Sequence, residues 1–316
     1  MIPDPERAML LQEVAALRAS VVELARPASD GDVPLLLEDR FGRHAINPDK
    51  LGEQWFILPL DDQPLAVPAN GRVSSGWSIP EDAGHAGDFE VAGLVGRGTT
   101  PFLLRMSAVG IEANAFSQNP VHHALCLGQG ALPFTLAETA FFPAGSFVSV
   151  EVTNLSTTLA GSVELALVGR KLTNEMPEGA RRDLADFLRS RPSRPYWAVL
   201  DRSPVSLTAG QKDVERYITM PSGSHLAAEM VLAESSGPFD VKIYDGQSGR
   251  QLTYGAIDSR LITGHGGLPA RTLGAPIIQP RRSLRVLFSD RSGEANTIYF
   301  ALHGRRLQLP VARSAG

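Results

Sequence analysis

One stretch of this sequence occurs twice: Leu125-Cys126-Leu127-Gly128-Gln129-Gly130-Ala131-Leu132-Pro133 returns 136 positions later as Leu261-Ile262-Thr263-Gly264-His265-Gly266-Gly267-Leu268-Pro269. The two segments share the pattern L-x-x-G-x-G-x-L-P. A repeat of this kind indicates that a larger unit has been duplicated, and the sequence around it should then match at the same spacing.

Three further blocks match at nearly the same spacing and in the same order: 101–106 with 238–243, 143–147 with 280–284, and 166–172 with 301–307. We infer two copies of one module, at 51–174 and 193–316. A period this long exceeds that of a solenoid repeat, and each copy is large enough to build a core of its own.

The composition and the short apolar runs predict β-structure. The chain of 316 residues contains 30 Gly and 23 Pro, yet 43% of it is apolar, which indicates many short elements joined by turns rather than disorder. Strands are predicted at 55–60, 89–95, 102–106, 147–152 and 163–168. In the fourth run Val148, Val150 and Val152 share one face, as a half-buried strand requires. The last two runs together are typical of a hairpin with a longer loop, and the second copy is expected to end in the same way, with Gly-basic-basic-Leu after the hairpin.

About eight strands per copy predict a fold of two tandem jelly-roll-like β-sandwiches, mainly β, with an N-terminal helix and a linker helix. The predicted domains are 1–50 (N-terminal helix and arm), 51–174 (first sandwich), 175–192 (linker helix) and 193–316 (second sandwich). The linker helix is expected at 177–189, because a short apolar stripe runs through it and Pro192 prevents its continuation.

The N-terminal helix is the candidate interaction site. Asp4 can cap it, Pro5 suits its first turn, and no Gly or Pro occurs from 7 to 26. Two interpretations stay open: the helix packs on its own protein, or it is a docking or oligomerising arm. The candidate interface residues have the spacing of a heptad and are Leu10, Val14, Leu17, Val21 and Leu24.

The sequence offers no catalytic constellation. Cys126 is the single cysteine, which excludes an internal disulfide and a cysteine-rich metal site, and its match to Ile262 predicts a buried core position. His122 and His123 have no second cluster of ligands at a suitable spacing, so we expect polar loop or core histidines. The G-x-G segments lack a P-loop lysine and are interpreted as plain turns, and no G-x-S-x-G nucleophile motif occurs. We therefore expect no enzyme, no cofactor and no bound metal.

The charges argue against nucleic acid and membrane as partners. The net charge is −4, and basic pairs such as Arg281-Arg282 are interpreted as solvated surface or as ion pairs with neighbouring subunits. No apolar run reaches the length of a membrane span, and the first residues have no basic signal-peptide region. Trp55 and Trp197 fall near the start of each module, which favours core packing.

Several motifs recur together in the second copy: Tyr196-Trp197, the D-x-x-S-G-R-x-L segment at 245–252, Leu268-Pro269, and Leu302-His303-Gly304-Arg305. The first copy keeps Trp55-Phe56, Leu132-Pro133 and Leu167-Val168-Gly169-Arg170 but lacks the S-G-R segment. In this order the motifs resemble a module of structural proteins from tailed bacteriophages.

The resemblance implies a structural component of a phage particle, such as a head decoration, cement or minor capsid protein that acts through protein–protein interfaces. Its implied partners are other virion proteins of the capsid or neck and further copies of itself. Its implied location is the virion, after synthesis in the host cytoplasm. A neck, collar or tail component and a carbohydrate-binding adhesion module are the alternatives, and the latter predicts paired aromatic residues on exposed loops.

Overall fold

The computed structural model describes residues 36–37, 44–45, 53–60, 63–82, 85–86, 88–109, 116–129, 132–172, 193–272 and 277–308. The chain divides into two compact units, 1–51 and 52–316. In the first unit β1 (Leu36–Leu37) pairs antiparallel with β2 (His44–Ala45). The predicted N-terminal helix with its stripe and the predicted linker helix lie outside the described residues. All that follows concerns the second unit.

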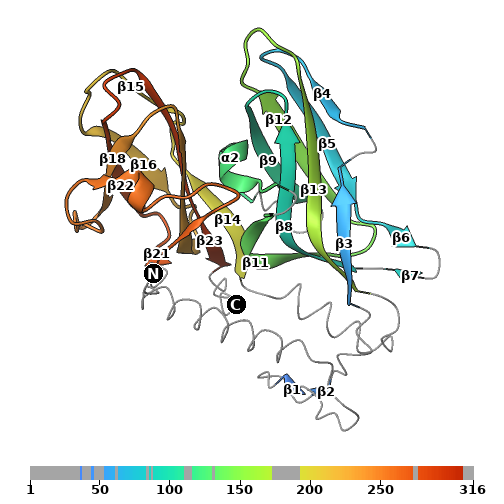
Figure 1. Ribbon diagram of the computed structural model, residues 1–316. Helices are drawn as coiled ribbons and strands as arrows, with labels where there is room; N and C mark the ends of the chain where they lie inside the picture. The colour runs from blue at the N-terminus through green and yellow to red at the C-terminus, as the bar shows by residue number, and fades with distance from the viewer. Residues whose placement is uncertain are drawn as a thin grey trace, which may run out of the picture. The chain divides into compact units, whose positions relative to one another are not determined.

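The strands between 53 and 172 form two antiparallel sheets (Figure 1). The β3 sheet has the order β11 (Phe134–Phe142), β8 (Asp88–Gly98), β13 (Gly161–Leu172), β3 (Glu53–Pro59), with β4 (Leu65–Val67) beside β13. The β5 sheet has the order β10 (Val121–His122), β9 (Phe102–Val109), β12 (Phe147–Asn154), β5 (Arg72–Ser78). A small ribbon pairs β6 (Glu81–Asp82) with β7 (His85–Ala86). The order of the eight main strands is that of a jelly roll.

The strands between 193 and 308 repeat this connectivity. The β14 sheet has the order β14 (Ser193–Val199), β23 (Asn296–Gln308), β17 (Ser224–Ser235), β20 (Ala270–Arg271), with β15 (Val205–Leu207) beside β23 and β21 (Ile277–Ile278) beside β17. The β16 sheet has the order β16 (Val214–Thr219), β22 (Ser283–Asp290), β18 (Phe239–Asp245), β19 (Ile257–Asp258). The prediction of a mainly β, jelly-roll-like chain is confirmed.

The repeated glycine segments are tight turns, as their sequence predicts. The Gly128 N–H donates to the Leu94 carbonyl at 3.2 Å, and the Gly264 N–H donates to the Val231 carbonyl at 2.9 Å. A Cβ atom at either glycine would lie 2.0 or 2.2 Å from the carbonyl oxygen four residues further on. No other residue type fits such an approach, which explains why both copies carry glycine there.

The predicted hairpin at the end of each copy is wrong. β12 pairs with β5 and β9, whereas β13 pairs with β3, β4 and β8 in the other sheet. The individual strands are right, and Val148, Val150 and Val152 are buried as expected. Alternation reports which face of a strand is buried and carries no information on its partner, so the crossing of 155–160 between sheets escapes it.

The Gly-basic-basic-Leu motif lies within the last strand of each copy rather than after a hairpin. Gly169 and Gly304 both mark a register shift against β8 and β17. A Cβ atom there would lie 2.0 Å from the Glu90 oxygen or 1.9 Å from the Ala227 oxygen. The motif therefore records the close approach of two backbones at a β-bulge.

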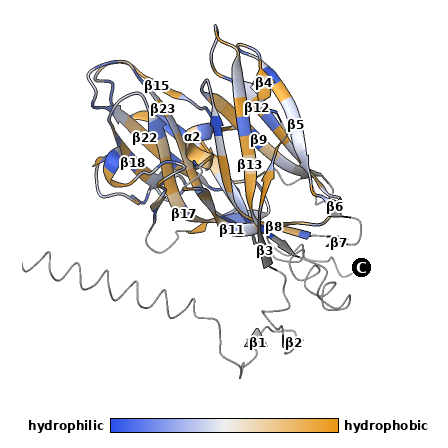
Figure 2. Ribbon diagram, turned by 45° about the vertical axis from the view of Figure 1, so that its right-hand side comes forward, coloured by the Kyte–Doolittle hydropathy of each residue, from blue (hydrophilic) through white to orange (hydrophobic). Residues whose placement is uncertain are grey.

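Apolar residues follow the strands of both sandwiches and build two cores (Figure 2). One core consists of residues from 196 to 302 alone. The other contains the core of the first sandwich and extends into the β14 sheet through Trp197, Val199, Met230, Leu232 and Ala301. The two jelly rolls thus share buried apolar structure within one compact unit.

Candidate functional site

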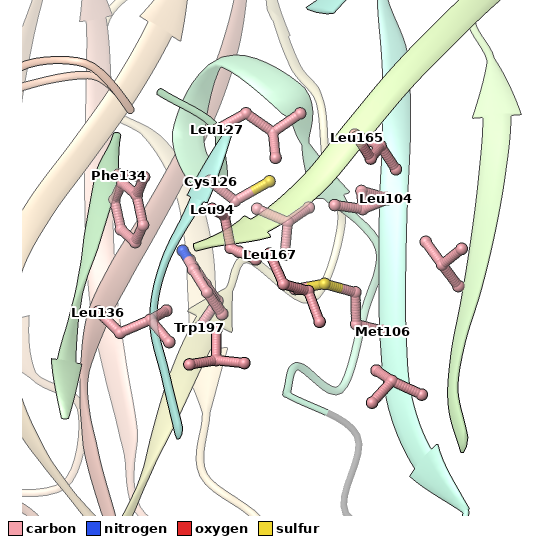
Figure 3. Packing of buried hydrophobic residues seen from close by; sticks show 14 of the residues in the cluster. Leu94, Leu104, Met106, Cys126, Leu127, Phe134, Leu136, Leu165, Leu167 and Trp197 are labelled. Carbon is pink, nitrogen blue, oxygen red and sulfur yellow. The ribbon is translucent and has the colours of Figure 1, made fainter. Parts of the chain in front are cut away.

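The contact between the two jelly rolls, which we call the joint, is built from buried apolar side chains. The first jelly roll contributes Leu125 and Cys126 from α2 (His123–Cys126), with Leu127, Phe134 and Leu136 next to them. The second contributes the five residues of the β14 sheet named above. Figure 3 shows the Trp197 ring among Leu94, Cys126, Phe134 and Leu136. Burial of this kind is the main force that holds two domains together.

The β14 sheet is consequently buried on both faces. Tyr196 and Ala198 belong to the core of the second jelly roll, whereas Trp197 and Val199 belong to the joint. The sequence records this as the unbroken apolar run 196–200, in contrast to the alternation at 147–152. Such a run is typical of strands covered on both sides, and it was the signal available for finding the joint.

Backbone hydrogen bonds cross the joint as well. The Trp197 N–H donates to the Phe116 carbonyl at 2.8 Å, and Ser117 pairs with Trp197 in parallel orientation. Residues 116–119 of the first jelly roll therefore cover the outer edge of β14. On the other side of the joint the Gly266 N–H donates to the Ala124 carbonyl at 2.6 Å.

Three histidines lie in and around the joint. His303 is fully buried, its Nε2 accepts a hydrogen bond from the Ala137 N–H at 3.0 Å, and its ring lies 4.2 Å from that of Trp197. Burial lowers the pKa of His303 to about 3. It also lowers the pKa of His122 to about 3 and that of His123 to about 4. His122 is the last residue of β10, and His123 is the first residue of α2. The His122 ring stacks on the ring of Tyr299 in the second jelly roll, with their centroids 4.1 Å apart.

His122, His303 and Cys126 are buried, and His123 is half-buried next to them. Cys126 is 1% exposed, which confirms the predicted core position, and burial raises the pKa of its thiol far above the usual range. Across the described part of the chain no group of three His, Cys, Asp or Glu side chains is placed to hold a metal ion. Within the same residues no helix is long and apolar enough to cross a membrane.

Ile57 holds the position in the first jelly roll that Trp197 holds in the second. The sequence match of Trp55-Phe56 with Tyr196-Trp197 is therefore off by one residue. Ile57 pairs with Val168, one residue before the bulge glycine of β13, and Trp197 pairs with His303, one residue before that of β23. Trp197 packs in the joint at 1% exposure, whereas Ile57 is 52% exposed.

The strand that carries Ile57 ends at a groove of about 660 Å³, which Pro59 helps to line. Pro59, Val95 and Ala166 supply apolar parts of its lining, and Gln129 lies at one side. Arg97 and Glu164 also line it and form an exposed ion pair at 2.6 Å. This groove is our candidate functional site. The stripe Leu10, Val14, Leu17, Val21 and Leu24 lies outside the described residues and stays a prediction.

No protein-family model and no curated protein matches the chain in sequence. Among solved structures the chain is similar to a structure titled as the STIV major capsid protein, with 9% identity, a TM-score of 0.35, and coverage of 83% of this chain and 99% of that one. It is also similar to a chain of the Sulfolobus turreted icosahedral virus particle, with 13% identity, a TM-score of 0.22, and coverage of 81% of this chain and 61% of that one. A third similarity is to the VP2 subviral particle of infectious bursal disease virus, with 12% identity, a TM-score of 0.21, and coverage of 92% and 77%.

Proposed function

We propose that this chain is a structural protein of a virus particle, which acts through protein–protein interfaces and not through catalysis. The observation that carries the proposal is the pair of eight-stranded jelly rolls held together by shared buried apolar structure. Viral capsids are one of the main settings of the jelly roll. A joint with its own hydrogen bonds makes a wide building block of fixed internal geometry, which suits a repeating shell.

The candidate groove supports an interface more than a reaction site. Its lining is mainly apolar, and Arg97 and Glu164 are paired with each other. An apolar centre with a polar rim is the usual composition of a surface that becomes buried against another protein.

Within the particle we propose a head decoration, cement or minor capsid role in a bacteriophage, with other virion proteins and further copies of the chain as partners. The support for this placement is the sequence resemblance to phage structural modules. Neck, collar and tail positions share that support. Synthesis in the host cytoplasm follows from the same proposal.

The test is to measure the chain in purified particles. Quantitative mass spectrometry should find it at a fixed stoichiometry to the major shell protein, and gold labelling should place it on the head. Labelling at the neck or tail would replace the head assignment. Absence of the chain from particles that are infectious and complete would overturn the structural role.

A carbohydrate-binding role is the second candidate, because the Tyr254 side chain is 99% exposed in the loop after β18. Exposed aromatic rings stack on sugars through their apolar faces. Saturable binding on a glycan array that is lost in the Tyr254→Ala variant would favour adhesion. Equal background signals from the two proteins would argue against it.

A further inference from the structure

Several residues of the joint have counterparts in the internal repeat that, within the described part of the chain, are partly or largely exposed. We propose that the groove face of the β3 sheet docks a second copy of this chain, whose residues 252–261 repeat the contacts that the first jelly roll makes with the second. The inference deepens the proposed structural role and rests on it for its biological purpose. The contact itself is tested on the isolated protein.

The receiving face is repeated in the first jelly roll. The positions of Trp197, Val199, Leu232 and Ala301 in the joint correspond to those of Ile57, Pro59, Val95 and Ala166. The equivalence is fixed by matching bridges, since Val95 pairs with Gly128 and Leu232 pairs with Gly264. The four counterparts are apolar, and three of them line the groove, whereas their equivalents are all buried in the joint.

The docking element is repeated in the second jelly roll. The Phe116 N–H donates to the Met106 carbonyl at 3.1 Å, and the Leu252 N–H donates to the Ile243 carbonyl at 2.8 Å. Met106 and Ile243 hold the same place in β9 and β18, so Leu252 is the counterpart of Phe116. Leu252 is 47% exposed and Tyr254, two residues on, is 99% exposed.

The short helix of the joint has a counterpart too. Leu125 in α2 corresponds to Leu261 in the 3₁₀ turn η1 (Ser259–Leu261) through the L-x-x-G-x-G-x-L-P repeat. Leu125 is 1% exposed in the joint, whereas Leu261 is 79% exposed. The exposed Leu261 corresponds to one side of the joint, and the apolar groove corresponds to the other side. In the proposed contact these two surfaces meet.

The strand edges agree with this arrangement. The edge of β14 is covered by 116–119, whereas among the described residues β3 pairs with β13 alone. In a repeated contact the Ile57 N–H would donate to the Leu252 carbonyl of the second copy, as Trp197 donates to Phe116. Leu261 of that copy would enter the groove beside Val95 and Ala166.

The two surfaces of this contact are different, so the association is head to tail. Such a contact closes into a ring or grows into a chain, depending on the rotation between neighbours. A head-to-tail contact also predicts a specific behaviour of blocked variants, because each copy carries one groove and one docking element.

The experiment uses two blocking variants and a matched control. Ile57→Arg places a charge on the receiving face, and Leu261→Arg places one on the docking element. Leu159→Arg changes a leucine that is 63% exposed on the 155–160 loop and belongs neither to the groove lining nor to the docking element. Light scattering coupled to size exclusion should show assemblies for the full-length chain and for Leu159→Arg, and monomers for each blocking variant. An equal mixture of the two blocking variants should give dimers and nothing larger, since one intact groove meets one intact docking element.

Assembly of either blocking variant at the level of the unaltered chain would overturn the proposal, as would a mixture that stays monomeric. A monomeric unaltered chain at every concentration up to its solubility limit would also overturn it. Thermal melts of all variants close to that of the parent protect the test against loss of folding. If the chain does not self-associate but is present in particles, the contact is wrong and the structural role stands. If the chain self-associates but is absent from particles, the contact stands and the structural role is wrong.

A covalent test is available through the counterpart of the Ser117–Trp197 bridge. The double variant Ile57→Cys/Thr253→Cys should form disulfides between copies on mild oxidation, because paired positions of neighbouring strands lie within reach of a disulfide. The control pair Leu159→Cys/Thr253→Cys should not, and Cys126 is buried and does not compete. Equal cross-linking of both pairs would contradict the proposed geometry.

Discussion

The Nε2 atom of His303 accepts a hydrogen bond from the backbone N–H of Ala137 at 3.0 Å. The bond links the last strand of the second jelly roll to β11 of the first. A backbone N–H can only donate, so Nε2 carries no proton and the imidazole is neutral. The joint therefore depends on the protonation state of a fully buried side chain.

We predict that acid destabilises the protein well before its carboxylates titrate. In the folded chain the pKa lies at about 3 for His122 and His303 and at about 4 for His123, against an ordinary value of 6.5. Below pH 6.5 these histidines are protonated in the unfolded chain and stay neutral in the folded chain. Their effect on the free energy of unfolding is therefore absent above pH 6.5 and becomes more destabilising as the pH drops towards 3 to 4. Each histidine contributes a slope of up to about 1.4 kcal/mol per pH unit.

Urea unfolding at pH 7.5, 6.0 and 5.0 measures this effect. His303→Gln, which keeps an acceptor but does not titrate, should lose less stability on acidification than the parent chain. His265→Asn changes an exposed histidine and should follow the parent. Identical unfolding midpoints at pH 7.5 and 5.0 would contradict the role of the histidines.

Trp197 and Ile57 hold equivalent positions, and their truncation should have unequal effects. Trp197→Ala removes a ring that is 1% exposed in the joint and should reduce the free energy of unfolding by about 3–5 kcal/mol. Ile57→Ala changes a side chain that is 52% exposed and should cost about 0.5 kcal/mol in the monomer. Denaturant melts of both variants measure the difference. A loss of unfolding free energy for Trp197→Ala as small as that expected for Ile57→Ala would mean that the joint adds little to stability.

Two glycine substitutions compare the cost of a steric clash with the cost of an unfavourable backbone conformation. Gly304→Ala would place a Cβ atom 1.9 Å from the Ala227 oxygen, so we expect a loss of about 3 kcal/mol or failure to fold. Gly210 has a φ of +68° but nothing within 4 Å of a Cβ atom, and Gly210→Ala should cost about 1 kcal/mol. Expression yield and thermal melting compare the two. Equal effects would show that the strand relaxes around the new methyl group.

The stripe of Leu10, Val14, Leu17, Val21 and Leu24 leads to a prediction about assembly. Removal of residues 1–27 should impair incorporation into particles, since a heptad stripe suits a docking arm. Replacement of Leu17 and Val21 by Glu in the full chain should have the same effect, with Glu13→Gln as a control on the same segment. Incorporation of the truncated chain at the normal level would sink the arm hypothesis and favour a helix that packs on its own protein.

The duplication was predictable because it lies in residues that backbone geometry dictates. Gly128 and Gly264 sit where no Cβ atom fits, so both copies show them in the sequence. The partner of β12 was not predictable, because alternating valines define a buried face and leave the neighbour open. The buried position of Cys126 followed from its match to Ile262.

The candidate groove could not be found from the sequence, because equivalent residues have opposite exposures. Leu125 and Leu261 are identical in type and in motif, yet one is buried and the other is exposed. The difference arises from what covers each position in the folded chain, and a local pattern does not contain it. The run 196–200 carried the nearest signal, since it lacks the alternation of a strand with one free face.

Coverage of the β14 edge by residues 116–119 has a consequence for the making of the protein. An uncovered strand edge can pair with the strands of other chains, which favours aggregation. Residues 116–119 precede β14 in the chain, so they are synthesised before the strand edge that they cover. A fragment that starts at residue 193 would lack both that cover and the partners of Trp197 and Met230, and we expect it in inclusion bodies. The order of the two copies along the chain is thus itself a safeguard during folding.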